Sequence, residues 1–166
     1  MKDYKKYIKE GKTRSDLTNL YSNPEVFNSV INDMSQPFLD KGITKVVALD
    51  ALGFVFGARI SEKLNTGLVL ARKKGKIEIE SKSISFTDYT KKEKSLEIAV
   101  GVINKNDKVL MVDDWAETGA QLRAVASLVE EMGGTVVGAT CFSIEKIIFE
   151  DPTLSKYRLH SVNTLR

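Results

Sequence analysis

The chain has 166 residues, of which 42% are hydrophobic and 28% are charged, so it fits about one globular domain and is too apolar to be disordered. Its 25 basic and 22 acidic residues give a net charge of +3, too small an excess to indicate a nucleic-acid partner, although it suits a site that receives phosphates. One cysteine, Cys141, and one histidine, His160, exclude an internal disulfide framework and a Cys/His zinc cluster.

Hydropathy excludes an obvious membrane or secretory segment. No apolar run approaches the about 20 residues that a membrane span needs. The start, MKDYKKYIKEGK, lacks the apolar stretch of a secretory signal. We therefore expect a cytoplasmic protein with no membrane partner and no nucleic-acid partner. The chain has no repeat and no Pro/Gly-rich linker, which predicts a single domain over residues 1–166.

The first 40 residues predict two helical segments. Tyr4, Tyr7 and Ile8 have helical spacing, so residues 3–10 are expected to form a short amphipathic helix or an arm against a partner. Asn23 before Pro24 predicts a helix start, because the asparagine side chain can accept from exposed amides and proline has no amide to lose there. The buried face of that helix is predicted to be Val26, Phe27, Val30, Ile31 and Met34.

From residue 45 onward, apolar runs alternate with amphipathic segments. The predicted strands are Lys45–Leu49, Gly67–Ala71, Leu96–Val102, Lys108–Val112 and Thr135–Ile144, and the predicted helices are Phe54–Leu64 and Thr118–Met132. Ile77, Ile79, Ile84 and Phe86 lie in polar surroundings, which predicts a two-stranded excursion or a mobile flap. This order indicates an α/β fold with a doubly wound, mostly parallel sheet flanked by helices. Ligands bind such sheets at the carboxyl ends of the strands, near a switch in strand order.

The strongest chemical signal is the segment VLMVDDWAETGAQ, from Val109 to Gln121. Asp113 and Asp114 follow a hydrophobic strand, so their carboxylates can accept hydrogen bonds from a pair of sugar hydroxyls. The next loop, Ala116–Gly119, opens a helix whose free amides and positive dipole end suit a phosphate. Together these features match ribose 5-phosphate. The alternative is two exposed acids that precede a helix only because acids favour helix N-termini.

This order of strand, Asp-Asp-x-x-x-Thr-Gly and helix resembles the phosphoribosyl-diphosphate signature of type I phosphoribosyltransferases. Four further segments resemble the adenine phosphoribosyltransferases of that family. They are Asp16–Thr18 with Asn23, Pro24 and Phe27, then Asp50–Gly57, then Arg72–Lys76, and last Thr87–Tyr89 with Leu96–Ile98. The resemblance covers about residues 12–143, most of the chain.

The resemblance implies transfer of a phosphoribosyl group from phosphoribosyl diphosphate to a purine base, most simply adenine, with release of pyrophosphate. It implies Mg²⁺ bridged mainly by the substrate, and it assigns no metal ligand in the chain. It also implies a hood and a flap, which we place at residues 1–40 and 76–95. It further implies a homodimer, in which Phe54, Phe56 and Arg59 lie at the interface or, alternatively, in ordinary helix core.

The resemblance also assigns site residues. Asp113 and Asp114 would bind the ribose, and Asp88 would be the catalytic group that handles the proton of the incoming base, one methylene shorter than the flap glutamate of the family. The 5′-phosphate residues would be Ala116, Glu117, Thr118, Gly119, Ala120 and Gln121. The diphosphate residues would be Asp50, Ala51, Leu52, Gly53, Arg72 and Lys76. The base would lie against Arg14 and Ser15.

Several departures from the family pattern fall on these positions. Leu52 stands where the family carries arginine, and a lost charge-assisted hydrogen bond weakens binding by about 1.5–3 kcal/mol. Ala120-Gln121 replaces Gly-Thr, and Glu117 is unusual in the loop. Trp115 is predicted either to lie over the ligand or to pack under the sheet edge.

These departures leave alternative functions open. Leu52 favours a regulator that binds phosphoribosyl diphosphate or a nucleotide with weakened turnover. Arg14-Ser15 in place of Phe-Arg favours a phosphoribosyltransferase for another base. A transcriptional regulator is disfavoured, because the chain has no room for a helix-turn-helix domain.

Overall fold

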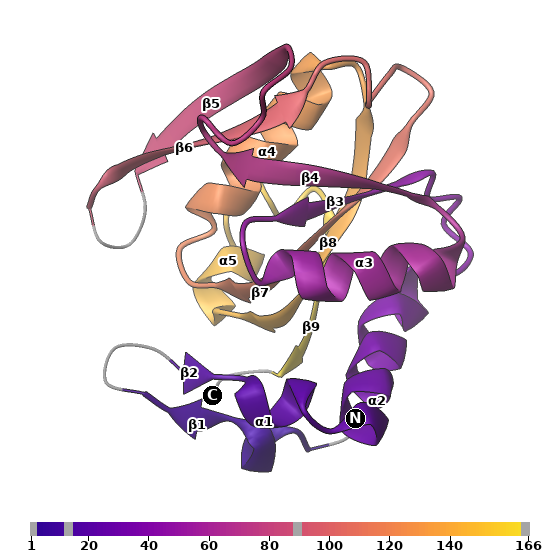
Figure 1. Ribbon diagram of the computed structural model, residues 1–166, viewed down its shortest axis with the longest axis vertical. Helices are drawn as coiled ribbons and strands as arrows, with labels where there is room; N and C mark the ends of the chain where they lie inside the picture. The colour runs from indigo at the N-terminus through magenta and orange to yellow at the C-terminus, as the bar shows by residue number, and fades with distance from the viewer. Residues whose placement is uncertain (1–2, 12–14, 88–90, 164–166) are drawn as a thin grey trace.

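The computed structural model describes residues 3–11, 15–87 and 91–163 (Figure 1). Two of the predicted site residues, Arg14 in the hood and Asp88 in the flap, lie outside these ranges, as does Tyr89. Within the described residues, no helix is long and apolar enough to cross a membrane.

A seven-stranded sheet forms the centre of the described molecule, with the strand order β5-β6-β4-β3-β7-β8-β9. Its strands are β3 (Lys45–Leu49), β4 (Gly67–Lys73), β5 (Ser81–Thr87), β6 (Glu93–Ala99), β7 (Lys108–Ala116), β8 (Thr135–Ile144) and β9 (Arg158–Asn163). The five strands from β4 to β9 are parallel, whereas β5 and β6 form an antiparallel hairpin that pairs with β4 at one edge. The prediction of a mostly parallel sheet is therefore confirmed.

Helices cover both faces of this sheet. They are α1 (Thr18–Tyr21), α2 (Pro24–Ser35), α3 (Gly53–Leu64), α4 (Ala120–Glu131) and α5 (Lys146–Phe149), with 3₁₀ turns η1 (Lys5–Tyr7) and η2 (Gln36–Phe38). Figure 1 shows α3 and α2 on one face and α4 on the other. A small antiparallel pair, β1 (Lys9–Glu10) and β2 (Ser15–Asp16), lies beyond α1.

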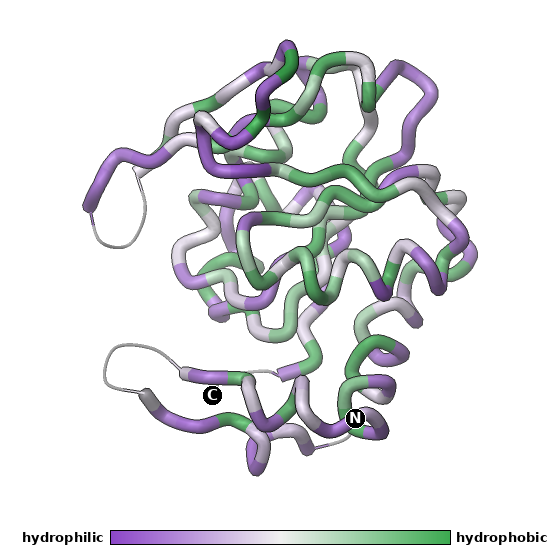
Figure 2. The backbone as a smooth tube through the Cα atoms, in the orientation of Figure 1, coloured by the Kyte–Doolittle hydropathy of each residue, from purple (hydrophilic) through white to green (hydrophobic). Residues whose placement is uncertain are grey.

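Apolar side chains on the central strands are buried on both faces. Val46 packs with the α2 and α3 side chains, whereas its neighbour Val47 packs with the α4 side chains. The same alternation holds along β7, where Leu110 belongs to the first cluster and Met111 to the second. Continuous hydrophobic runs such as KVVAL are typical of parallel strands covered on both sides. Figure 2 shows the hydrophobic backbone segments gathered in these central strands.

The start of α2 agrees with its prediction. The Asn23 side-chain oxygen accepts a hydrogen bond from the Val26 amide at 3.1 Å, and Pro24 occupies the first helical position. Three of the five predicted buried residues, Val30, Ile31 and Met34, are at most 3% exposed. Val26 and Phe27 are partly buried against the same cluster.

Several predicted elements differ from the structure. Residues 3–10 form a 3₁₀ turn and a short strand instead of an amphipathic helix, because Lys9 pairs with Asp16 and the Tyr4 hydroxyl donates to Asp33. The strand at residue 108 continues to Ala116, and the following helix begins at Ala120 instead of Thr118. The flap region is a hairpin of the main sheet, so its second strand begins at Glu93.

His160 lies on β9, a strand that the sequence does not predict. Its Nδ1 lies 3.3 Å from the Thr140 hydroxyl, and its ring meets Phe38 edge-on. These contacts give His160 a structural role between β9, β8 and Phe38.

Tyr21 carries a buried hydroxyl with no hydrogen-bond partner, although its ring packs against Phe27 and Phe56 at 5.8 and 5.6 Å. An unsatisfied buried polar group destabilises a fold, so Tyr21→Phe should raise the free energy of unfolding by about 1 kcal/mol. Tyr4→Phe is the matched control, because the Tyr4 hydroxyl donates to Asp33 at 2.7 Å and its loss should lower stability. Urea unfolding measures both variants, and destabilisation by Tyr21→Phe would contradict the expectation.

Candidate active site

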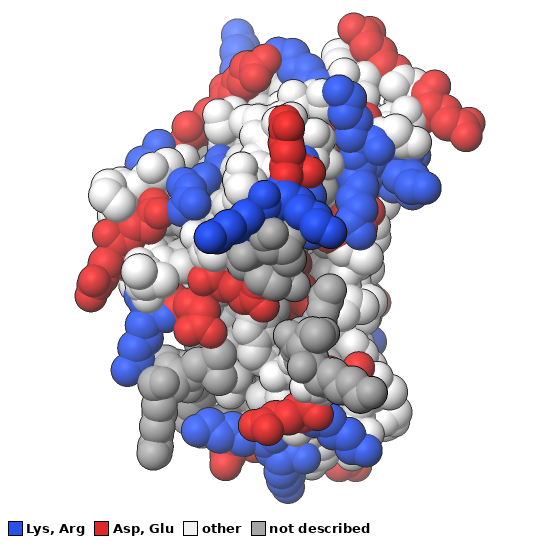
Figure 3. All heavy atoms as spheres, turned by 90° about the vertical axis from the view of Figure 1, so that its left-hand side faces the viewer, with Lys and Arg blue, Asp and Glu red and all other residues white. Residues whose placement is uncertain are grey.

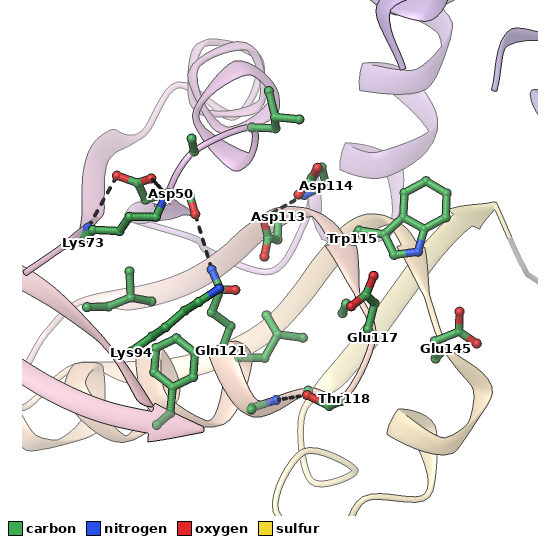
Figure 4. Close-up of a pocket in the computed structure, with 18 of the residues that line it drawn as sticks. Asp50, Lys73, Lys94, Asp113, Asp114, Trp115, Glu117, Thr118, Gln121 and Glu145 are labelled. Carbon is green, nitrogen blue, oxygen red and sulfur yellow. Dashed lines mark hydrogen bonds and ion pairs between the residues drawn. The ribbon is translucent and has the colours of Figure 1, made fainter. Parts of the chain in front are cut away.

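A cavity of about 410 Å³ opens at the carboxyl ends of β3 and β7 (Figure 4). The chain proceeds from β3 to β4 on one side and later places β7 on the other side of β3. The strand order therefore switches between β3 and β7, which is where ligands bind in open α/β sheets. The lining includes Asp50–Leu52 after β3, Asp113–Ala116 on β7, Glu117–Leu122 of the turn and α4, Lys73 on β4, Phe86 on β5, Lys94–Leu96 on β6, and Ser15 and Glu145.

Asp113 and Asp114 lie on the last part of β7 and both line the cavity. Asp113 is 4% exposed, and its Oδ1 accepts a hydrogen bond from the Asp114 amide at 2.9 Å. Burial raises the pKa of the Asp113 carboxyl well above its ordinary value, and the neighbouring Asp114 and Asp50 charges add to this rise. The pair therefore presents hydrogen-bond acceptors in a place that disfavours a second negative charge.

The predicted phosphate residues, from Ala116 to Gln121, all line the same cavity. Gly119 has a φ of +71°, and a Cβ there would lie 2.8 Å from Leu154 Cδ1, so the turn requires glycine. α4 begins directly after it and presents the amides that a helix leaves without intrahelical partners. The Arg123 guanidinium donates to the Thr118 carbonyl at 3.2 Å and pairs with Asp151, which ties this turn to the C-terminal segment.

The predicted diphosphate loop, Asp50 to Gly53, borders the cavity from the end of β3. Its Asp50–Ala51 peptide is cis, and the Asp50 carbonyl accepts from Gln121 Nε2 at 3.4 Å. A Cβ on Gly53 would lie 2.8 Å from the Val112 carbonyl and 3.0 Å from Asp113 Oδ1. α3 can therefore start against β7 only because residue 53 is glycine. Leu52 is 40% exposed and lines the cavity where the family pattern has arginine.

Arg72 and Lys76 do not belong to the described cavity lining. Arg72 Nη1 donates to the Lys76 carbonyl at 2.6 Å, and the Lys76 amide donates to Glu97 at 2.8 Å. Since β4 continues to Lys73, Arg72 and Lys73 point to opposite faces of the sheet. Lys73 is the residue that lines the cavity, and its Nζ lies 3.2 Å from Asp50 Oδ1. The diphosphate roles of Arg72 and Lys76 stay predictions.

The sequence analysis missed Lys73 and Lys94 as cavity residues. The signal that could have found them is the two-residue alternation of the strands. Lys73 continues the row of Val69 and Ala71, and Lys94 precedes Leu96 and Ile98 on one row of β6. Both rows face the core cluster under α4.

Trp115, Glu117 and Glu145 lie together on the far side of the cavity from Lys73 and Lys94 (Figure 4). The Trp115 ring packs against Phe142, with ring centroids 5.9 Å apart, and also lines the cavity. Trp115 therefore packs against Phe142 and borders the cavity, and its place over a ligand stays a prediction. Ser15, predicted to contact the base, lines the cavity from β2.

The charges in the cavity are divided unevenly. Among the described residues, its lining contains the carboxylates of Asp50, Asp113, Asp114, Glu117 and Glu145 and only two cations, the ammonium groups of Lys73 and Lys94. On the side of the molecule where the two hairpins project, basic side chains gather across the upper middle and acidic side chains lie below them (Figure 3). An anionic ligand must therefore place its most negative part near the two lysines.

The fold and the site place the chain in a broad class of α/β proteins. Adjacent carboxylates that run into a helix N-terminus at the strand switch are typical of α/β proteins that bind a sugar phosphate or nucleotide. The chain belongs to a particular family of this class, the phosphoribosyl transferase domain family, whose model matches residues 16–152.

Several proteins named adenine phosphoribosyltransferase are similar to this chain in sequence or in structure. The chain is 41% identical over 133 residues to the adenine phosphoribosyltransferase of Proteus mirabilis, covering 80% of this chain and 72% of the relative. It is 37% identical over 150 residues to that of Pseudothermotoga lettingae, covering 86% and 87%. The crystal structure of adenine phosphoribosyltransferase from Rhodothermus marinus is 29% identical and superposes with a TM-score of 0.88, covering 97% and 96%.

The buried Asp113 carboxyl gives a stability prediction. Its raised pKa means that the folded state holds this proton more tightly than the unfolded chain, so stability falls as the pH rises above about 4, the ordinary carboxyl value. Asp113→Asn removes this penalty and keeps an acceptor for the Asp114 amide, so it should raise Tm at pH 7.5 and change it little at pH 3.5. Calorimetry at both pH values measures the effect. Asp40→Asn, at an exposed position, is the control; a lower Tm for Asp113→Asn at pH 7.5 would contradict the expectation.

Proposed function

We propose that this protein is a purine phosphoribosyltransferase that transfers the 5-phosphoribosyl group from phosphoribosyl diphosphate to adenine, with release of pyrophosphate. The observation that carries the proposal is the run from Asp113 and Asp114 through Gly119 into α4, which lines one cavity at the strand switch. Its family membership and the names of its relatives support the same reaction.

In this proposal the donor is held at its two ends. Asp113 and Asp114 accept hydrogen bonds from the two ribose hydroxyls, and the amides of the turn from Ala116 to Gln121 bind the 5′-phosphate. Binding at both ends fixes C1′ between the diphosphate loop and the base. Such positioning converts an encounter of two substrates into a reaction within one complex.

The chemical step breaks the bond between C1′ and the diphosphate oxygen and forms a bond between C1′ and a ring nitrogen of the base. The electron pair leaves with the diphosphate, so positive charge grows on the sugar and negative charge on the leaving group. The amides of Ala51, Leu52 and Gly53 and the nearby cations would stabilise the leaving group. The incoming base loses a proton, and Asp88 is the expected acceptor by resemblance.

Mg²⁺ is proposed as the cofactor. The described residues contain no group of three or more His, Cys, Asp or Glu side chains that could hold a metal ion. Asp113 and Asp114 nevertheless offer the carboxylate oxygens that Mg²⁺ takes, one or two at a time, together with phosphate oxygens of a substrate. When bound, the ion would neutralise charge on the diphosphate. A site in which the protein offers one or two carboxylates and the substrate offers the remaining oxygens suits a Mg²⁺ ion that binds together with the donor.

A second candidate function follows from Leu52. An exposed leucine in the diphosphate loop weakens the hold on the leaving group but leaves the ribose and phosphate contacts intact. A protein of this kind could bind phosphoribosyl diphosphate or a nucleotide as a regulator with little turnover. Arg14 and Ser15, the predicted base residues, also leave a phosphoribosyltransferase for another base open.

Pyrophosphate release separates these functions. Incubation with phosphoribosyl diphosphate, Mg²⁺ and a panel of purines should release pyrophosphate with adenine. Asp113→Asn combined with Asp114→Asn should abolish donor binding in calorimetry while circular dichroism stays unchanged, because the acceptors for the ribose hydroxyls are weakened and the fold is not touched. Tight donor binding without release from any base would select the regulator. Unchanged donor affinity in the double variant would contradict the ribose assignment.

We also propose a homodimer in a cytoplasmic setting. Phe56 is fully buried and Phe54 is partly buried, so of the three predicted interface residues only Arg59 is exposed. The support comes instead from large apolar side chains exposed by 37–41% on neighbouring α3 and β4, namely Val55, Leu68 and Leu70. The single cysteine, Cys141, is buried and free, which suits a reducing compartment.

Burial of this apolar face predicts a test of the dimer. Leu68→Glu should shift the sedimentation coefficient from dimer to monomer at micromolar concentration, because a charge in an apolar interface is costly to desolvate. Ile79→Glu is the control, since Ile79 is 69% exposed and lies outside this face. An unshifted dimer in Leu68→Glu, or a monomeric parent protein, would contradict the proposal.

A further inference from the structure

The cationic end of the cavity lacks part of the charge that a diphosphate needs. Leu52 contributes no charge, and the two predicted cations, Arg72 and Lys76, lie outside the described cavity lining; Arg72 donates instead to the backbone carbonyl of Lys76. Lys73 lines the cavity but forms an ion pair with Asp50 at 3.2 Å. A diphosphate carries more negative charge than one lysine can balance.

Lys94 is the other basic side chain in the described cavity lining. It lies on β6 directly opposite Phe86 of β5, and Lys73 of β4 pairs in register with Leu96, two residues farther along β6. Side chains two residues apart on a strand share a face, so Lys94 and Leu96 both face the cavity. Figure 4 shows the Lys94 side chain extending into the cavity from β6, on the side where Lys73 and Asp50 lie.

We propose that Lys94 binds the diphosphate of the donor and supplies the positive charge that Leu52 cannot. This inference rests on the proposed function, because it needs a diphosphate in the cavity. It assigns specificity to a residue outside the motifs that carry the family resemblance. The flap hairpin then contributes a charge to the leaving-group end as well as a cover.

The geometry explains why a lysine on β6 can replace an arginine at position 52. Both positions line one cavity, Leu52 from the diphosphate loop just before α3 and Lys94 from β6 of the antiparallel hairpin. A flexible four-carbon side chain can reach an anion in the cavity from this neighbouring hairpin. The carboxylates of Glu117 and Glu145 on the far side of the cavity disfavour the diphosphate there, whereas the 5′-phosphate is proposed to bind the amides of the turn from Ala116 to Gln121.

The test compares ligands with and without a diphosphate. Lys94→Gln should weaken Mg²⁺–phosphoribosyl diphosphate and Mg²⁺–pyrophosphate at least tenfold in calorimetry, as expected for one lost charge-assisted contact. Ribose 5-phosphate should bind within twofold of the parent protein, because its contacts lie on Asp113, Asp114 and the phosphate turn. Lys94→Arg keeps the charge and should retain affinity. Lys92→Gln is the matched control, an exposed lysine near the same strand that does not line the cavity.

A second measurement tests directly whether the Lys94 charge compensates for the missing arginine at position 52. Leu52→Arg should restore donor affinity in the Lys94→Gln protein by more than it improves the parent, so the two changes should be non-additive. Equal donor affinity in Lys94→Gln and Lys92→Gln would overturn the inference, and so would an equal loss for ribose 5-phosphate. Failure of the parent protein to bind the donor at all would instead count against the proposed function.

Discussion

The parallel pairing of β3 with β7 is the constraint on which the site depends. It brings the end of one strand, at Asp50, beside the end of another, at Asp113, although 63 residues separate them in the chain. Neither strand could form the cavity alone, since one leads into the predicted diphosphate loop and the other carries the predicted ribose acids and phosphate turn. Gly53 makes this pairing usable, because any side chain there would collide with the Val112 carbonyl.

The pairing of β3 with β7 also brings three carboxyl groups close together, which is unfavourable for the stability of the fold. Asp113 is buried beside Asp114 and near Asp50, and burial raises its pKa. Without a ligand this cluster costs stability, whereas a sugar diol or a cation would turn each carboxylate into a satisfied acceptor. Binding sites often concentrate such unfavourable groups, because the ligand and not the protein supplies their partners. The cost at Asp113 is thus physical support for a site, separate from any resemblance.

Sequence reasoning worked where one segment determines its own structure. Thr135–Ile144 has the predicted bounds, since a continuous apolar run needs burial on both faces, and Asn23 caps α2 by a local contact. Prediction from the sequence failed where the bounds of an element depend on pairing with a strand from a distant part of the chain. β7 extends to Ala116 because β8 continues beside it, with Trp115 opposite Ser143, and residues 9–10 become a strand because residues 15–16 lie alongside. The polar strand β9 has no apolar pattern of its own and follows from pairing with β8.

The residues of the site also fall into those that a local motif predicts and those that depend on the pairing of distant strands. Motif order identified the residues from Asp113 to Gln121, because a ribose phosphate needs acceptors and amides at fixed spacing along one segment. The cationic end depends on which face of β4 and β6 each basic side chain occupies. Because β4 continues through Lys73, Lys73 shares the face of Ala71 and lines the cavity, whereas Arg72 lies on the opposite face. Under the proposed function, charge at the leaving-group end is a property of the sheet edge, so a chain can lose an arginine from its loop and recover a cation from a neighbouring strand without altering the motif from Asp113 to Gln121.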